Sequence, residues 1–225
     1  MAPHVRAHKI RVVDGLAWAT LLSADEQAKA ARFRFQADTD RFVAGRGAVR
    51  ELVGRALDAD PRGLRFGEGR FGKPFVVDGG SLRFNVSHSG AWVLIALVDD
   101  VEVGIDVELS RPDFDVMEVG ATVFSERELA SLTKLSASAA REAFFRLWTR
   151  KEAALKAWGT GFSLDPRRVH AGTDSAPVRI VEAPDRAFFP ATVEDMIVDQ
   201  SHAGAWAVAP LNDGMPPPSR DLAGC

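Results

Sequence analysis

This chain of 225 residues contains very little cysteine and no long hydrophobic run. Its one cysteine, Cys225, is the last residue, so no disulfide can form within the chain and nothing marks an oxidising compartment. No stretch reaches the ~20 consecutive apolar residues of a membrane-spanning helix, and residues 1–13 lack the apolar core of a secretion signal. We therefore expect a soluble, cytoplasmic protein without a membrane partner.

The sequence also lacks the strong positive charge of most nucleic-acid-binding proteins. Its formal net charge is −3 and its isoelectric point is about 6.0, which argues against a nucleic-acid partner. Residues 1–75 hold 14 Lys and Arg against 9 Asp and Glu, whereas residues 76–132 hold 3 against 11. Such an arrangement suits a polyanion at one end and a divalent cation at the other, but ordinary surface charge explains it equally well.

Two common site patterns are absent. No cluster of Cys and His residues has the spacing of zinc ligands. Residues 61–80 form a Gly- and Pro-rich loop with the sequence Gly72-Lys73-Pro74, and this loop does not match the Walker A pattern. Glycine lets a backbone approach a ligand closely, but as evidence for a phosphate loop this segment is weak by itself.

Apolar periodicity and turn residues predict helices and short strands in the first half. A capping box at Ser23–Glu26 is expected to open the first helix. The expected helices cover 23–35 and 40–57, and the expected strands cover 4–13, 82–86, 91–98 and 101–108, with a turn at 87–90.

The second half repeats this alternation. After an irregular segment at 113–123, a second capping box at Ser125–Glu128 opens a short helix, and a longer helix ends at Gly159. Strands are expected at 178–182, 188–193, 195–200 and 205–209, and the tail from about residue 212 is expected to be disordered.

An internal echo indicates a duplication. The sequence SHSGAW at 87–92 returns as SHAGAW at 201–206, matching at five of six positions. The predicted fold class is α+β, with a pseudo-two-fold duplication of two similar α+β halves at 1–109 and 110–225. Each half is expected to pack a small, mostly antiparallel sheet against helices, with a ligand cleft at their interface.

The sequence GIDVE at 104–108 ends the third expected strand. Because side chains alternate along a strand, Asp106 and Glu108 point to the same face. Two adjacent carboxylates repel each other unless a cation or proton lies between them, and oxygen-only ligands favour magnesium. Acidic pairs at an exposed strand end are also commonly solvated, so this motif leaves both interpretations open.

The stretch RLWTRKEAALKAWG at 146–159 reads as an amphipathic helix. Its apolar stripe consists of Phe144, Leu147, Trp148, Leu155 and Trp158, and the two tryptophans are expected to be core residues. Glu152 and Lys156 lie four residues apart, which is the spacing of an ordinary surface ion pair. Taken alone, the helix favours that simple interpretation.

Taken together, these motifs point to one family. GKP, SHS, GIDVE, FSERE and LWTRKEAALK occur in this order across 72–156, and the chain from about Ser23 to Pro166 resembles the Sfp-type 4'-phosphopantetheinyl transferases. That family moves the phosphopantetheine arm of coenzyme A onto a serine of an apo acyl, peptidyl or aryl carrier protein and leaves adenosine 3',5'-bisphosphate. The resemblance also implies a magnesium-dependent monomer.

The resemblance assigns a role to each motif residue. It implies that Asp106, Glu108 and Glu152 bind magnesium, which manganese can replace, together with the pyrophosphate of coenzyme A. Residues implied to hold coenzyme A are Lys29 at the 3'-phosphate, Gly72, Lys73, Ser87 and His88 at the nucleotide, and Lys151 and Lys156 at the pyrophosphate.

The resemblance also implies that Lys156 assists the reaction by stabilising charge on the leaving group. Other positions have a second interpretation or depart from the family pattern. Glu128 matches the carboxylate that would take the serine proton, but a capping box explains a glutamate there equally well. Glu26 stands where some relatives have a lysine, which predicts a less cationic 3'-phosphate pocket. His88 is expected to face the ligand, and His202 in the echo is expected to be structural.

The irregular segment after GIDVE is a candidate contact for the carrier protein. Phe114, Met117, Val119 and Phe124 would form an apolar surface there, or else fill the core between the halves. Two other functions use the same residues: a hydrolase or nucleotidyl enzyme that cleaves coenzyme A without a carrier, and a binding module without turnover. The intact acidic positions disfavour the binding module.

Overall fold

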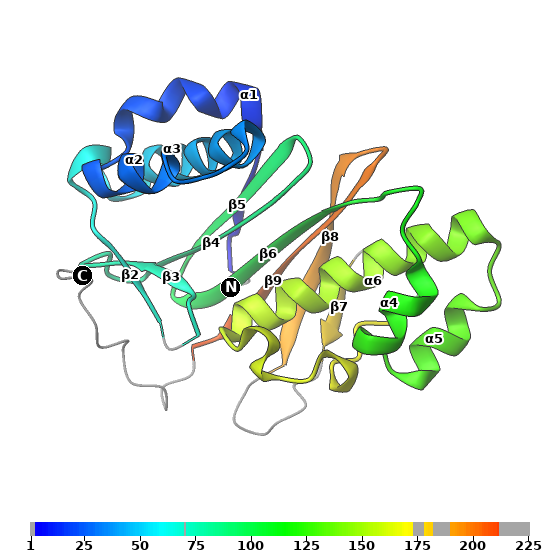
Figure 1. Cartoon of the computed structure of the whole chain (residues 1–225). Coiled ribbons are helices and arrows are strands. Elements are labelled where there is room, and N and C mark those ends of the chain that lie inside the picture. The colour runs from blue at the N-terminus through cyan, green and yellow to red at the C-terminus, as the bar shows by residue number, and fades with distance from the viewer. Residues whose placement is uncertain (1–2, 70, 173–177, 182–189, 212–225) are drawn as a thin grey trace.

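The computed structural model describes residues 3–69, 71–172, 178–181 and 190–211, and the tail expected to be disordered lies outside them. The expected α+β class is confirmed, with small antiparallel sheets packed against helices (Figure 1). The helices are α1 (Val12–Gly15), α2 (Ala24–Ala30), α3 (Gln36–Leu57), α4 (Val116–Val123), α5 (Glu126–Leu132) and α6 (Ala137–Trp158), with 3₁₀ turns η1 (Leu16–Leu21), η2 (Pro61–Gly63), η3 (Gly161–Ser163) and η4 (Pro166–Arg168).

Within the described residues, the strands form three antiparallel sheets. One has the order β1-β5-β4, the second pairs β2 with β3, and the third has the order β6-β9-β8-β7. The strands are β1 (Arg6–Arg11), β2 (Phe66–Glu68), β3 (Pro74–Val76), β4 (Leu82–Ser89), β5 (Trp92–Asp99), β6 (Val101–Leu109), β7 (Val178–Val181), β8 (Ala191–Asp199) and β9 (His202–Pro210).

The larger sheets share one order of connection. In the first, the leading strand β1 precedes the long helix α3, and β4 and β5 follow as a hairpin whose second strand pairs with β1. In the other, β6 precedes α6, and β8 and β9 follow as a hairpin whose second strand pairs with β6.

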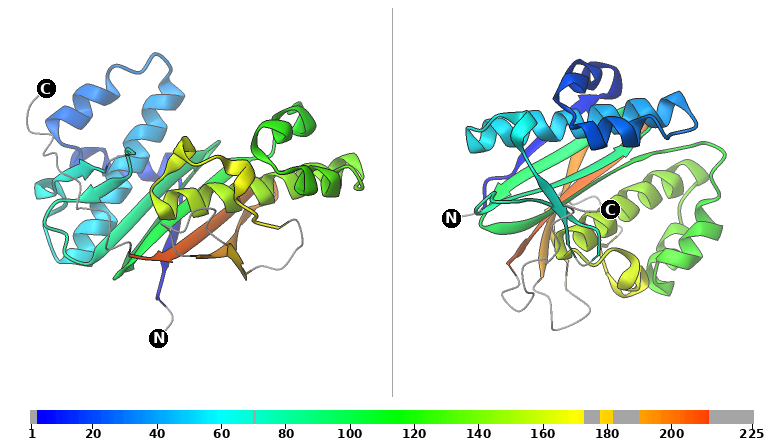
Figure 2. Two further views of the ribbon diagram at one scale, coloured as in Figure 1. Left: turned by 90° about the horizontal axis from the view of Figure 1, so that it is seen from below. Right: turned by 60° about the vertical axis from the view of Figure 1, so that its left-hand side comes forward.

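The core is layered because β5 and β9 are apolar on both faces. Odd-numbered β5 residues such as Ile95 pack with α3, and even-numbered residues such as Leu94 pack with β6 and β9. In β9, alanines such as Ala205 lie in the core that includes α6, and Val208 faces the first sheet. Figure 2 shows α2 and α3 on one side of the sheets and α6 on the other.

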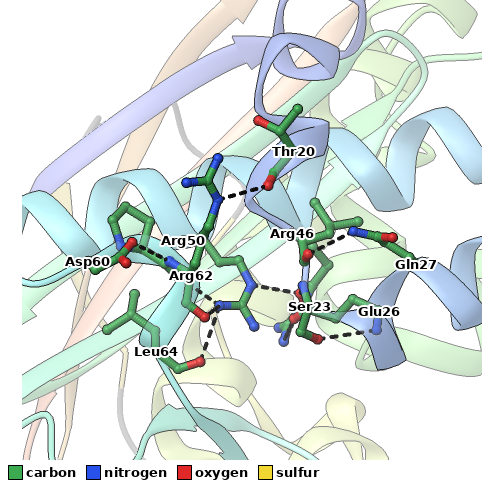
Figure 3. Close-up of polar contacts among 11 residues, drawn as sticks. Thr20, Ser23, Glu26, Gln27, Arg46, Arg50, Asp60, Arg62 and Leu64 are labelled. Carbon is green, nitrogen blue, oxygen red and sulfur yellow. Dashed lines mark hydrogen bonds and ion pairs between the residues drawn. The ribbon is translucent and has the colours of Figure 1, made fainter.

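A buried cluster of hydrogen bonds and ion pairs connects the helices of the first half (Figure 3). Ser23 and Glu26 form the expected capping box of α2, and Glu26 also accepts hydrogen bonds from Arg46 and Arg50 of α3. Arg50 in addition donates to the carbonyl oxygen of Pro61 at 2.7 Å. One carboxylate and one guanidinium thus join α2, α3 and η2.

The second half has the same kind of cluster. Ser125 and Glu128 form the expected capping box of α5, and Glu128 accepts a 2.7 Å hydrogen bond from Lys151 of α6. Lys151 also donates to the carbonyl oxygen of Pro166 at 2.9 Å. In each half, a buried cation of the long helix therefore links a capping-box glutamate to an Asp-Pro-Arg turn.

Several expected boundaries are wrong. The irregular segment at 113–123 contains α4, which Asp115 caps by accepting hydrogen bonds from the amides of Met117 and Glu118. The two strands expected at 188–200 are one strand, β8, within the described residues. The turn expected at 87–90 lies later, because β4 continues to Ser89.

Candidate active site

Asp106 on β6 is the centre of a polar cluster between the two larger sheets. It is only 3% exposed. Its Oδ1 accepts hydrogen bonds from Lys156 Nζ at 2.6 Å and from Ser87 Oγ at 2.8 Å. Lys156 Nζ also lies 3.1 Å from Ser87 Oγ and 3.2 Å from the carbonyl oxygen of Ile105. The structure thus joins three sequence-predicted residues from β4, β6 and α6.

Gly104 allows α6 to come this close to β6. A Cβ atom at Gly104 would lie 2.0 Å from the carbonyl oxygen of Ala153 and 2.4 Å from the amide nitrogen of Ala157. Both atoms belong to the backbone of α6, so no side-chain rotation relieves the clash. Because Lys156 lies on this turn of α6, glycine at 104 sets its distance from Asp106.

Side chains of β4 bridge to β6 at alternate positions. Asn85 Oδ1 accepts a hydrogen bond from the amide of Ile105, and Ser87 donates to Asp106. Ser89 Oγ accepts from the amide of Leu109 at 3.0 Å and donates to Glu108 at 3.3 Å. Since side chains two apart share a strand face, one face of β4 orients both acidic residues of β6.

Glu108 is held on both carboxylate oxygens. Ser89 donates to Oε2, and the indole Nε1 of Trp148 donates to Oε1 at 3.3 Å. Burial and then the charge of Asp106 raise the pKa of Glu108, while the two hydrogen bonds and Lys156 oppose the rise. The Glu108 carboxylate therefore has a defined orientation, but its surroundings disfavour its negative charge.

Glu152 is the third carboxylate of the cluster. Burial raises its pKa from 4.5 to about 7, with Asp106 and Glu108 adding to the rise and Lys156 opposing it. Glu152 lies one helical turn before Lys156, which binds Asp106, so it lies near the face of α6 that packs against β6. Three acidic groups that repel one another in a half-buried site favour a bound cation or proton.

The donor set fits a hard cation. Asp106 Oδ2 and Glu152 Oε1 are buried and have no hydrogen-bond partner within the described residues. Oxygen ligands of this kind suit magnesium, which binds through few carboxylates and keeps waters or substrate oxygens. Among the described residues, however, no group of three or more His, Cys, Asp or Glu side chains is already arranged to hold a metal ion.

A cavity of about 570 Å³ opens beside Glu108. Its wall combines residues from the first half, including His88, with residues from the second half. The lining residues are Arg41, His88, Ser89, Gly90, Glu108, Leu109, Arg111, Phe114, Val119, Phe144, Phe145 and Trp148. The lining thus combines apolar and aromatic side chains with basic and polar groups.

His88 has an environment that keeps its ring neutral. Burial lowers its pKa, and the charges of Arg41 and Lys156 add to that shift. A neutral imidazole beside Arg41 can donate and accept hydrogen bonds at the cavity wall.

His202 has a different environment. Its side chain is 5% exposed, and Nδ1 lies 2.9 Å from Asp199 Oδ1. A Cβ atom at Gly90 would lie 2.6 Å from its Nε2, so the ring packs directly against the β4–β5 turn. This packing agrees with the expected structural role of His202.

The apolar residues considered for carrier contact divide into two groups. Phe114 and Val119 line the cavity, and Met117 is exposed. Phe124 is 1% exposed and packs against Phe144 with tilted rings whose centroids lie 5.0 Å apart, so it is a core residue and not a surface contact.

Gly72 and Lys73 lie at the β2–β3 turn. Gly72 has a φ of 79°, which the tight turn between Gly69 and Lys73 requires and glycine supplies without strain. Lys73 Nζ binds Glu102 at 2.5 Å and the carbonyl oxygen of Ala157 at 3.0 Å. Lys73 therefore connects β6 to the end of α6, where its acceptor Ala157 directly follows Lys156.

Lys29 is exposed on α2, with Nζ 5.5 Å from the centroid of Phe42. Glu26 does not face the same surface. It is 8% exposed and binds Arg46 and Arg50 (Figure 3). The expectation that Glu26 weakens a cationic pocket at Lys29 does not agree with this position, because two arginines already neutralise its charge.

Lys151 and Glu128 do not lie with the acidic cluster. Lys151 is 0% exposed, and its ammonium has three acceptors: Glu128, Val123 O and Pro166 O. The expectation that Lys151 faces a pyrophosphate therefore disagrees with the structure, because all three donors are used in the interior. Glu128 has the cap role, although its Oε1 has no hydrogen-bond partner in the described part of the chain.

Four residues of the site were not predicted. Gly104 sets the helix–strand distance, Ser89 and Trp148 orient Glu108, and Arg41 lines the cavity. Ser89 carried a usable signal, since it lies two residues after Ser87. Trp158, by contrast, is a core residue as expected.

Comparison with known sequences matches both parts of the chain to one enzyme family. The profile of the 4'-phosphopantetheinyl transferase superfamily matches residues 102–208, and that of the 4'-phosphopantetheinyl transferase N-terminal region matches residues 14–99. The chain is 35% identical over 194 residues to the 4'-phosphopantetheinyl transferase HetI of a Nostoc species, covering 85% of this chain and 80% of HetI.

Two other relatives match over shorter spans. Identity to the 4'-phosphopantetheinyl transferase Sfp of Bacillus subtilis is 32% over 145 residues, covering 64% of this chain and 63% of Sfp. Identity to the 4'-phosphopantetheinyl transferase AcpT of Salmonella typhimurium is 40% over 112 residues, covering 50% of this chain and 57% of AcpT.

Proposed function

The chain belongs to the 4'-phosphopantetheinyl transferase superfamily, and we propose that it transfers the phosphopantetheine arm of coenzyme A to a serine of an apo carrier protein. The observation that carries this proposal is the meeting of Asp106, Ser87 and Lys156 beside Glu108 and Glu152. The acceptors are acyl, peptidyl or aryl carrier proteins, and the second product is adenosine 3',5'-bisphosphate.

Asp106, Glu108 and Glu152 would hold the magnesium ion. The unpaired buried oxygens of Asp106 and Glu152 and the raised pKa values of Glu108 and Glu152 support this assignment. The bound ion would neutralise the charge of the pyrophosphate, with manganese as a substitute. Ser87 and Ser89 orient two of the three carboxylates, which would reduce the rearrangement needed when the ion and the substrate bind.

In the transfer step, the serine oxygen of the carrier forms a bond to the phosphorus that bears the pantetheine arm. The bond from that phosphorus to the oxygen of the bisphosphate breaks, the bisphosphate leaves with the electron pair, and the proton of the serine hydroxyl passes to solvent water. Lys156 would donate a hydrogen bond to the leaving group in place of one of its present acceptors; its partly exposed side chain beside Asp106 supports this role. We leave Glu128 out of the reacting groups, since it caps α5 and binds buried Lys151.

The remaining contacts of coenzyme A are assigned to the first half and the cavity. Lys29 would bind the 3'-phosphate, and Gly72, Lys73 and His88 would hold the nucleotide. The position of His88 on the cavity wall and the exposure of Lys29 support these assignments. Phe114 and Val119 on the opposite wall would contact the carrier.

The proposal includes a duplicated architecture with halves at 1–109 and 110–225 and a ligand cleft between them. The shared order of strands and the matched clusters at Glu26–Arg50 and Glu128–Lys151 support it. A cavity with lining from both halves supports the cleft. A monomeric state and a cytoplasmic location complete the proposal and rest on family resemblance and on the single cysteine.

The direct test is incubation with coenzyme A, magnesium and a panel of apo carrier proteins, read by intact mass. We expect one phosphopantetheine per carrier with the wild type and none with Asp106→Ala or Glu152→Ala. Absence of transfer to every carrier, by a folded protein that binds coenzyme A, would contradict the proposal. Cleavage of coenzyme A without a carrier would point to a hydrolase instead.

A further inference from the structure

Three consecutive residues in the middle of α6 point to three different parts of the protein. Arg150 binds Asp195 of β8 through two hydrogen bonds of 2.6 Å. Lys151 binds Glu128 of α5 at 2.7 Å. Glu152 lies between Lys151 and Ala153, whose carbonyl oxygen packs against Gly104 of β6. The residue proposed to complete the magnesium site is therefore preceded directly by two buried anchors.

Lys151 holds three separate segments at one point. Its ammonium donates to Val123 O at the end of α4, to Glu128 at the start of α5 and to Pro166 O in η4. An ammonium has three donor hydrogens, so all of them have acceptors in the interior. α4 and α5 thereby gain a fixed position relative to α6 (Figure 1).

One of these segments, α4, forms part of a wall of the cavity. Val119 of α4 and Phe114 just before it line the cavity, as do His88 and Glu108. Since α4 ends at Val123, the hydrogen bond from Lys151 lies one helical turn from Val119. Movement of Lys151 would therefore move the wall relative to Glu152.

Stability alone is a poor explanation for this buried pair. Removing two charges from water is costly, and well-packed apolar residues commonly serve a fold equally well. Burial lowers the pKa of Lys151, with Glu128 opposing the shift, which is the signature of that cost. A buried ion pair with all its hydrogen bonds made does fix the relative position of the segments that it joins. Fixing the cavity wall in this way would offset the free-energy cost of burying the two charges.

We propose that Glu128 and Lys151 are positioning residues that hold α5 and the α4 wall of the cavity in place relative to Glu152 and thereby set the affinity for the acceptor protein. The effect on acceptor affinity rests on the proposed transfer function. The effect on the position of α4 and α5 does not, because it is a property of the protein without substrates. The two parts are tested by separate measurements.

The chain offers a matched control. Glu26 is the capping-box glutamate of α2 and binds a buried cation of α3, as Glu128 does in the other half. Glutamine is accepted at this position of a capping box, so Glu128→Gln and Glu26→Gln each keep the cap and remove the ion pair. Both variants therefore make the same chemical change, one in each half of the protein.

The first measurement is hydrogen exchange of the protein without substrates. We expect Glu128→Gln to raise amide exchange across 116–132 by about tenfold, and Glu26→Gln to leave that segment at the wild-type rate. Unchanged exchange at 116–132 in Glu128→Gln would overturn the positioning role. If Glu128→Gln does not fold, Glu128→Asp keeps the charge and the acidic first turn but shortens the reach to Lys151, and the same readout applies.

The second measurement is steady-state transfer with the two substrates varied separately. We expect Glu128→Gln to raise the KM for the apo carrier about fivefold with the KM for coenzyme A within about twofold of wild type. Glu26→Gln is expected to leave the KM for the carrier unchanged. Equal changes in both KM values would mean that the pair only supports the fold. If the wild type transfers nothing, the proposed function fails and the exchange result still decides the positioning role.

Discussion

The long helices α3 and α6 carry the same charge pattern and use it differently. Arg50 and Lys151 are each the fifteenth residue of a 22-residue helix, each is followed by a glutamate, and each glutamate is followed four residues later by a cation. In α3, Glu51 and Arg55 form an ion pair at 2.5 Å, and Arg55 is 75% exposed. This is the ordinary helix-surface pair.

Within the described part of the chain, the equivalent residues of α6, Glu152 and Lys156, do not pair with each other. Lys156 binds Asp106 and Ser87, and Glu152 keeps a buried oxygen without a hydrogen-bond partner in the described residues. The helix itself does not explain the difference. The strand packed against it does, because β6 has a glycine at 104 and carboxylates at 106 and 108, where α6 lies closest.

Removing the charge of Glu152 on α6 and of Glu51 on α3 should produce the largest difference in activity between equivalent variants of the two helices. Glu152→Gln is expected to lower kcat for phosphopantetheine transfer by about 10²–10³-fold, because a ligand of the proposed magnesium site and its charge are lost. Glu51→Gln should remain within about twofold of wild type. Intact-mass kinetics with saturating substrates measure both, and equal losses in the two variants would end the distinction between the helices.

Adding a methyl group between α6 and its strand is the second test. Gly104→Ala places a Cβ atom 2.0 Å from Ala153 O, so we expect a loss of about 3 kcal/mol of unfolding free energy and a longer Lys156–Asp106 distance. Gly45→Ala on α3 is the matched change. Its Cβ atom would have only Val93 Cγ1 nearby, at 3.9 Å, and it should be neutral or stabilise by about 0.5–1 kcal/mol.

Urea unfolding of both variants measures these changes. Similar stability of Gly104→Ala and wild type would mean that the close approach of α6 to β6 is unnecessary.

The dependence of stability on pH gives a third, smaller contrast. The pKa of Glu152 is about 7 in the folded protein and 4.5 without its surroundings, so the folded state binds more protons between these pH values. Its contribution is fully present below pH 4.5 and is lost as pH rises through 7. After allowance for partial exposure, the loss is on the order of 2 kcal/mol without metal.

Glu152→Gln removes this titration. Its unfolding free energy in EDTA should fall less than that of wild type between pH 4.5 and 7, whereas Glu51→Gln should follow the wild type. Urea unfolding at closely spaced pH values measures the slopes. Parallel slopes for wild type and Glu152→Gln would show that burial does not shift this carboxyl group.

The smallest effect is expected at the surface pair of α3. Arg55→Ala should change the unfolding free energy by less than about 0.5 kcal/mol, since exposed helix pairs contribute little. A change above about 1 kcal/mol would show that the α3 pair supports the fold after all, and the contrast with α6 would weaken.

The sequence allowed the main elements to be predicted from their periodicity. The paired carboxylates of β6 and their partners Ser87 and Lys156 were also predicted, because alternation and family motifs both selected them. α4 was missed, since its start depends on a cap from Asp115 after an irregular stretch. β8 was divided in two, because Glu194 and Asp195 interrupt its apolar residues.

The role of Lys151 could not be predicted from its position in a motif. Adjacent helical residues point about 100° apart, so Lys151 and Glu152 reach different surroundings although they are neighbours in the sequence. The sequence also contains no sign that Gly104 touches the backbone of α6. Such contacts depend on which elements pack together, and this packing is a property of the complete fold that local sequence patterns do not reveal.

Calorimetric titration of magnesium into the protein with coenzyme A present tests the central claim most directly. Wild type, Glu51→Gln and Glu152→Gln form the series, because the two glutamates occupy equivalent places on their helices. The account predicts saturable magnesium binding to wild type and Glu51→Gln and none to Glu152→Gln. Binding of magnesium to Glu152→Gln with wild-type affinity would contradict it.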